Sequence, residues 1–138
     1  MTILTLPATA AAFAPLDAWL DAAATAMDGA TAFRLRLVAH EAVGNVVMHA
    51  GASGLTLRLE AGPVLTVEDD GVPFDPSAYQ PPPPAADLET AALGGRGILL
   101  MRANAAMAYT RSAGRNRLTL TLRPAAAAGG GSGQPTPR

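Results

Sequence analysis

The chain of 138 residues contains no cysteine, which excludes disulfide bonds and thiolate metal sites. Only 4% of the residues are aromatic although 49% are hydrophobic, so the core must consist mainly of leucine, valine and alanine. Neither sign of charge predominates, because ten basic residues face eleven acidic ones, and no global charge favours nucleic acid or a membrane surface as a partner. A basic N-terminal leader and an apolar run of about 18 residues are also missing. We therefore expect a cytoplasmic protein that contacts neither a membrane nor nucleic acid directly.

The order of the expected elements indicates a single α+β domain over residues 1–124. Hydrophobic periodicity distinguishes helices from strands. It predicts strands over 2–6, 55–60, 64–69, 107–112 and 117–122, and helices over 15–29, 31–50 and about 97–105. Pro15 is expected to open the first helix, Gly29 to end it, and Thr31 to cap the second. This order favours a two-layer sandwich, in which helices cover one face of a mostly antiparallel sheet.

Two stretches are expected to lack regular structure. Prolines and glycines interrupt residues 70–95, which include four consecutive prolines at 81–84. So long a loop in a compact domain is usually either functional or disordered. Residues 125–138 form a tail rich in alanine, glycine and proline, which cannot contribute to a core and is expected to be disordered.

The first candidate site segment is the C-terminal part of the second expected helix. Glu41, Asn45 and His49 follow one another at intervals of four residues, so they line one stripe of the helix. Gly44 lies among them, where it costs about 1 kcal/mol relative to alanine and often permits another group to approach closely. Taken alone, the stripe is also typical of a solvated polar face.

The second candidate segment is the end of the strand over 64–69. Leu65, Val67 and Asp69 share one face of this strand, so Asp69 extends the inward apolar row. A buried carboxylate needs a hydrogen-bond donor, which the exocyclic amine of adenine would supply. Gly71 follows two residues later, and an ordinary Asp-Gly turn is the alternative interpretation.

The third candidate segment contains Gly95, Arg96 and Gly97 at the expected start of a helix. Glycines in that position let backbone N–H groups point at a phosphate, and the helix dipole favours the anion. Arg96 would add a positive charge. Glycine-rich turns also occur without any ligand.

In this order, the three segments resemble the GHKL ATPases over residues 10–123. Glu41-x-x-x-Asn45 is similar to their N box, Asp69-Asp70-Gly71 to their first glycine box, and Gly95-Arg96-Gly97 to their second. The sequences EAVGNVVMHA and DDGVPFDP resemble the branch of anti-sigma-factor serine/threonine kinases in particular. The four consecutive prolines depart from that pattern. The resemblance implies the Bergerat (histidine-kinase-like ATPase) fold.

The resemblance also implies a site for ATP and Mg²⁺ and a role for each candidate residue. Glu41 would be the general base that activates a serine or threonine hydroxyl. The other residues would bind the nucleotide or its metal: Asn45 as the Mg²⁺ ligand, Asp69 and Gly71 at adenine, Gly95, Arg96 and Gly97 at the phosphates, and His49 elsewhere in the nucleotide site. The proline-rich loop would be a lid that excludes water.

The partners are implied by the resemblance alone. They are a STAS-domain anti-sigma factor antagonist, which would be phosphorylated, and a sigma factor; the resemblance also leaves room for a homodimer. Two alternatives stay open: a nucleotide-gated binding module without kinase activity, and the detached ATPase part of a phosphorelay protein. Retention of Glu41 favours the kinase, because binding alone needs no general base.

Overall fold

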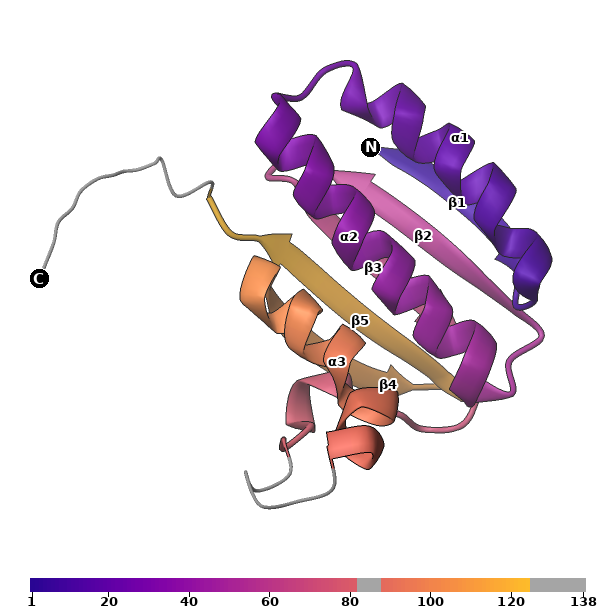
Figure 1. Ribbon diagram of the computed structural model, residues 1–138. Coiled ribbons are helices and arrows are strands. Elements are labelled where there is room, and N and C mark those ends of the chain that lie inside the picture. Colours follow the sequence, from indigo (N-terminus) through magenta and orange to yellow (C-terminus); the bar gives the residue numbers. More distant parts are fainter. Residues whose placement is uncertain (82–87, 125–138) are drawn as a thin grey trace, which may run out of the picture.

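The computed structural model describes residues 1–81 and 88–124, and these form a sheet covered by helices on one face (Figure 1). The strands are β1 (Thr2–Pro7), β2 (Gly54–Glu60), β3 (Val64–Asp69), β4 (Ala105–Ser112) and β5 (Arg115–Leu122). They pair antiparallel in the order β1-β2-β3-β5-β4. The helices are α1 (Phe13–Ala24), α2 (Gly29–Asn45) and α3 (Leu88–Asn104). The expected α+β sandwich is therefore confirmed.

The core lies between the sheet and its three covering helices, of which α2 runs over the middle of the covered face (Figure 1). Leu57 pairs with Leu4 on one side and with Val67 on the other, and Leu65 pairs with Leu120, so the inward rows of four strands coincide. Full burial of such side chains stabilises the fold by about 1.5–3 kcal/mol each. The facing residues of α2 are Leu35, Val38, Ala39, Ala42 and Val43. No helix of the described part is both long enough and apolar enough to cross a membrane.

The start of α2 differs from the prediction. The Asp28 carboxylate accepts hydrogen bonds from the backbone N–H of Thr31 at 2.8 Å and from its hydroxyl at 3.0 Å, so Asp28 is the N-cap. Gly29 is the first residue of α2, and the predictions that Gly29 ends a helix and that Thr31 caps one are wrong. The helical region ends where expected, because Gly51 adopts a left-handed φ of 61° directly after Ala50.

The first helix also begins earlier than predicted. Thr9 caps a short 3₁₀ turn at Ala10–Ala12, which leads directly into α1 at Phe13. Pro15 therefore lies within the first turn and does not open the helix.

The prediction that the last helix begins near Gly97 is wrong, because α3 begins at Leu88. The residues at 88–93 are mostly good helix formers, whereas each glycine in the helix costs about 1 kcal/mol. Packing against neighbouring residues, described below, offsets this cost. Residues 82–87 of the expected lid and the expected tail at 125–138 lie outside the described residues.

The hairpin of β4 and β5 is longer than predicted. Its turn consists of Ala113 and Gly114, whose φ values of 54° and 75° are typical of the tight turns that join twisted strands. Asn116, which we expected in the turn, therefore belongs to β5 and pairs with Asp69 of β3.

Candidate functional site

The ends of α2, β3 and β4 and the start of β5 surround a small cavity of about 30 Å³. Its apolar walls come mainly from helix and strand side chains, and its polar groups are Asn45, Asp69, Tyr109 and Asn116. The described residues that line it are Ala42, Asn45, Val46, Val67, Asp69, Phe74, Pro76, Tyr109, Asn116 and Leu118. Two residues predicted from separate motifs, Asn45 and Asp69, thus meet at one cavity.

Asp69 is only 5% exposed, which confirms that it faces inward. Its Oδ1 accepts hydrogen bonds from the Gly71 N–H at 2.8 Å and from the Asn116 Nδ2 at 3.0 Å. No described residue donates to its Oδ2. A buried carboxylate with one oxygen left over is suited to a ligand that brings its own donor.

Asn45 presents an amide to the same cavity. Its Nδ2 atom is buried and has no hydrogen-bond partner among residues 1–81 and 88–124. A buried donor without a partner costs about 1–3 kcal/mol, so a ligand that accepts this hydrogen bond would stabilise the site.

Glu41 lies one helical turn before Asn45 but does not line the cavity. A Cβ atom added to Gly97 of α3 would overlap Glu41 Oε1, so the carboxylate lies directly beneath this glycine. The structure therefore places Glu41, the candidate base, next to the third candidate segment, residues 95–97.

His49 leaves the stripe that the sequence predicted. After Asn45 the helix widens into a π-helical turn at Val46–Ala50, so a spacing of four no longer keeps side chains on one line. His49 is exposed, and its ring centroid lies 6.5 Å from that of Phe74, which does line the cavity. Contact between His49 and nucleotide stays a prediction.

Gly71 is required by a close approach between two segments. A Cβ atom at this position would overlap the Ala50 carbonyl oxygen, and the next residue, Val72, donates its N–H to that oxygen at 2.8 Å. The glycine thus lets the turn after β3 pass over the end of the π-helical turn that follows α2. Around Gly44, by contrast, no atom of the described residues outside its own helix backbone lies within 4 Å of an added Cβ, so these residues make no close approach there.

Gly95 and Gly97 lie inside α3, and the prediction that they start a helix is wrong. N–H groups in a helix interior bond to the carbonyl four residues earlier and do not point at a ligand. A Cβ at Gly95 would overlap the Tyr79 hydroxyl, so both glycines let α3 pack closely against its neighbours. Arg96 is exposed. Phosphate binding by this segment stays a prediction, and it requires a rearrangement of α3.

Asn116 is the site residue that sequence reasoning missed. It is 4% exposed and bonds to Asp69 and to the turn that follows β3. The signal was available, because Asn116 extends the inward row of Leu118, Leu120 and Leu122 just as Asp69 extends that of Leu65 and Val67. The strand bounds expected from the sequence, 107–112 and 117–122, leave Asn116 in the turn between them, where asparagine is common.

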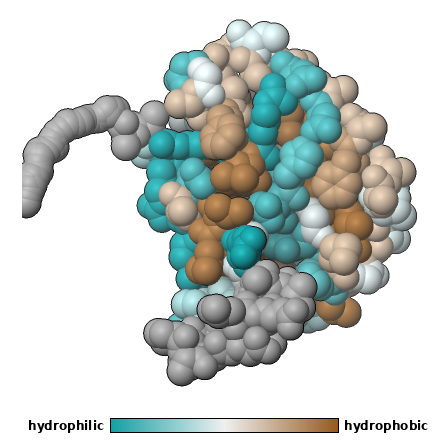
Figure 2. Space-filling model, in the orientation of Figure 1, coloured by the Kyte–Doolittle hydropathy of each residue, from teal (hydrophilic) through white to brown (hydrophobic). Residues whose placement is uncertain are grey.

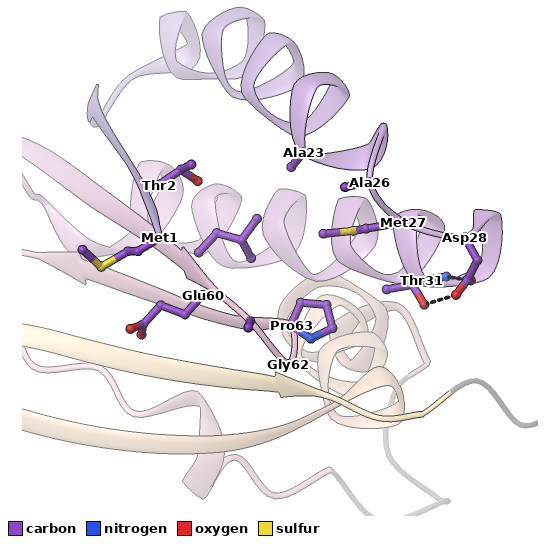
Figure 3. Close-up of a pocket in the computed structure, with 12 residues that line it drawn as sticks. Met1, Thr2, Ala23, Ala26, Met27, Asp28, Thr31, Glu60, Gly62 and Pro63 are labelled. Carbon is purple, nitrogen blue, oxygen red and sulfur yellow. Dashed lines mark hydrogen bonds between the residues drawn. The ribbon is translucent and has the colours of Figure 1, made fainter.

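A larger hollow of about 480 Å³ lies at the other end of α2 and β3 (Figure 3). Its lining includes Met27, the turn between β2 and β3 and two carboxylates, Asp28 and Glu60, of which Asp28 is already used to cap α2. Apolar residues also reach the helix-covered surface in several places (Figure 2), and Phe33 is 66% exposed. Neither feature brings together groups that could perform chemistry, so we assign the candidate site to the smaller cavity.

Asp70, next to Asp69, points to the other side and fixes the start of β2. Its carboxylate accepts hydrogen bonds from the Ser53 hydroxyl at 2.5 Å and from the Ser53 N–H at 2.9 Å. These bonds lower the pKa of Asp70 from 3.8 to about 2. The two neighbouring aspartates therefore have different roles, one structural and one at the cavity.

Comparison with known proteins agrees with this geometry. Residues 6–122 match the family described as the histidine kinase-like ATPase domain. The chain belongs to this family. It is also 42% identical over 97 residues to the serine/threonine-protein kinase BtrW of Bordetella bronchiseptica, an alignment that covers 64% of this chain and 68% of the relative. No solved structure matches the chain.

The ATPase domain offers groups that fit both ATP and Mg²⁺. The apolar walls of the cavity and the spare Asp69 oxygen suit a purine ring with an exocyclic amine. No three His, Asp or Glu side chains of the described part are grouped as a metal cluster. Asn45 would therefore be one of few protein ligands to the ion. This suits Mg²⁺, because it takes most of its ligands from phosphates and water.

We predict that alanine at Gly71 and alanine at Gly44 have opposite effects on the free energy of unfolding. Gly71→Ala should lower the free energy of unfolding by about 1–3 kcal/mol, because its Cβ overlaps the Ala50 carbonyl. Gly44→Ala should raise it by up to about 1 kcal/mol, because open space receives the methyl group. Urea denaturation measures both. A Gly71→Ala domain as stable as the wild type would contradict the packing described here.

We predict that the Asp70 carboxyl titrates with a pKa near 2. Because this value lies below the unfolded one of 3.8, its contribution to stability is present above pH 4 and disappears as the pH falls towards 2. NMR titration of Ser53→Ala should show the Asp70 pKa rising towards 3.8. Ser77→Ala is the control, since Ser77 bonds to Asp75 instead. An unchanged Asp70 pKa in Ser53→Ala would exclude Ser53 as the cause.

Proposed function

We propose that this ATPase domain is an ATP-dependent serine/threonine kinase and anti-sigma factor that phosphorylates a STAS-domain anti-sigma factor antagonist. The observation that carries the proposal is the meeting of Asn45 and Asp69 at one apolar cavity, with Glu41 one helical turn away. The serine/threonine kinase named among its relatives supports the reaction class. The STAS protein and the sigma factor come from the motif resemblance.

Adenine would lie between the apolar walls of the cavity, with its exocyclic amine donating to Asp69 Oδ2. The present cavity of about 30 Å³ has room for roughly two water molecules and is too small for a nucleotide. Phe74 and Pro76, from the segment after β3, form part of its wall. Binding therefore requires this segment to move outward, while α2 and the sheet keep Asn45 and Asp69 in place.

Asn45 would hold Mg²⁺ through its side-chain oxygen, and the bound ion supplies neutralisation of charge on the phosphates. Glu41 would accept the proton of a serine or threonine hydroxyl. The freed oxygen attacks the γ-phosphorus, the bond from that phosphorus to the bridging oxygen breaks, and ADP leaves. Because Gly97 covers Glu41 in the present structure, α3 must shift before an acceptor can reach the carboxylate.

The two alternatives differ in what they require of these residues. A nucleotide-gated binding module would need Asn45 and Asp69 but not the Glu41 carboxylate. The detached ATPase part of a phosphorelay protein would need the same nucleotide-binding residues but would not transfer phosphate to a serine or threonine of a STAS protein. The serine/threonine kinase among the relatives favours the kinase over this alternative.

We predict that Glu41→Ala lowers phosphate transfer by about 10²–10⁴-fold, which is the usual contribution of a general base. ATP affinity should stay within a few-fold of wild type, because the carboxylate lies outside the adenine cavity. Transfer from [γ-³²P]ATP to a STAS-domain protein of the same organism measures the first effect and calorimetry the second.

The matched control for this experiment is Glu60→Ala. Glu60 is an exposed carboxylate at the opposite end of the sheet, next to the larger hollow. The Glu60→Ala variant should transfer phosphate at the wild-type rate. Equal transfer by Glu41→Ala and wild type would remove Glu41 as the base, and a wild-type chain that binds ATP but phosphorylates no STAS protein would leave the binding module as the function.

A further inference from the structure

Asn116 connects three separate parts of the site through one side chain. It lies in β5 opposite Asp69 and is 4% exposed. Its Nδ2 donates to Asp69 Oδ1 at 3.0 Å and to the Val72 carbonyl at 2.8 Å. Its Oδ1 accepts from the Tyr109 hydroxyl at 2.5 Å and from Arg111 at 3.0 Å, both on β4.

These partners fix which way the amide points. Two acceptors surround the nitrogen, whereas donors surround the oxygen, including the Phe74 N–H at 3.4 Å. A flipped amide would place oxygen against oxygen at Asp69 and at Val72. Both N–H bonds and both lone pairs of the Asn116 amide are therefore already used, and no capacity is left for a ligand.

The same bonds determine the direction of the Asp69 carboxylate. Asn116 and the Gly71 N–H both hold Oδ1, so Oδ2 is the oxygen left for the cavity. Arg111 reinforces this arrangement, because it also donates to the Gly71 carbonyl at 2.7 Å. Without the Asn116 donor, the carboxylate could rotate and its free oxygen would no longer be held in one place.

We propose that Asn116 is a positioning residue that aims Asp69 Oδ2 into the cavity and thereby sets the preference for a nucleobase with an exocyclic amine. This role rests on the proposed nucleotide site. It makes the hydrogen bond between β5 and β3 a determinant of ligand selectivity as well as of the fold.

The test compares ATP with purine riboside triphosphate, which differs only in lacking the exocyclic amine. Wild type should bind ATP roughly tenfold or more tightly, the usual effect of one hydrogen bond to a charged group. Asn116→Leu keeps roughly the size of the side chain but removes both donors without adding a charge, and the variant's preference for ATP over purine riboside triphosphate should fall to within about twofold. If Asn116 had a purely structural role, its replacement would weaken the binding of both triphosphates equally and leave the preference for ATP unchanged.

Asn104→Leu is the matched control, because it makes the same chemical change on α3, where the Asn104 side chain donates to the Leu100 carbonyl outside the cavity. Its preference for ATP should equal that of wild type. Thermal unfolding checks that each variant is folded. If Asn116→Leu does not fold, Asn116→Thr replaces it and should show an intermediate preference, because it keeps one donor.

The outcomes separate this role from the site on which it depends. A wild-type chain that binds neither triphosphate would refute the nucleotide site itself. A wild type that discriminates, together with a folded Asn116 variant that discriminates equally well, would refute only the role of Asn116. Failure of both Asn116 variants to fold would assign the residue to the fold alone and would also overturn the proposal.

Discussion

The burial of the Asp69 carboxylate is the constraint on which the rest of the site depends. A carboxylate that is 5% exposed at the end of an apolar row would be costly without donors. The sheet order places β5 beside β3, so Asn116 can supply one donor, and the turn at Gly71 supplies another. Gly71 in turn has to be glycine, because this turn passes directly over Ala50, in the π-helical turn that follows α2. One buried charge thus ties together the sheet, the turn and the helix that carries Asn45.

The proposed nucleotide site combines a well-packed part with segments that would have to move on binding. Asn45 and Asp69 belong to α2 and β3, which pack on each other through buried leucine, valine and alanine. Phe74 and Pro76 narrow the cavity, and Gly97 lets α3 cover Glu41. A nucleotide would meet groups already in place and would displace only the covering segments. This division suits a kinase, since a cover that closes over bound nucleotide excludes water.

The sequence predicted the features that follow from periodicity. Strand parity placed Asp69 inward, and the same argument would have placed Asn116 inward had its residue type not suggested a turn. The end of the helical region at Gly51 was also predictable, because only glycine adopts a left-handed φ at no cost.

Features that depend on tertiary packing could not be read from the chain. Gly95 and Gly97 look like helix breakers, yet α3 accepts them because Tyr79 and Glu41 occupy the space that side chains would take. His49 left its stripe because the helix widens after Asn45, and no local residue pattern signals this. The contact of Gly71 with Ala50 likewise joins segments about 20 residues apart.

The recognition of adenine by Asp69 is the central claim, and a calorimetric titration of Asp69→Asn with ATP in the presence of Mg²⁺ tests it most directly. The variant keeps the shape of the side chain, and its oxygen can still accept from Gly71 and Asn116, so the fold should persist. Its amide nitrogen would now face the adenine amine, donor against donor. We predict that wild type binds ATP and that the variant binds at least roughly tenfold more weakly, with an unchanged unfolding temperature. Equal ATP affinity of the two proteins would contradict the account.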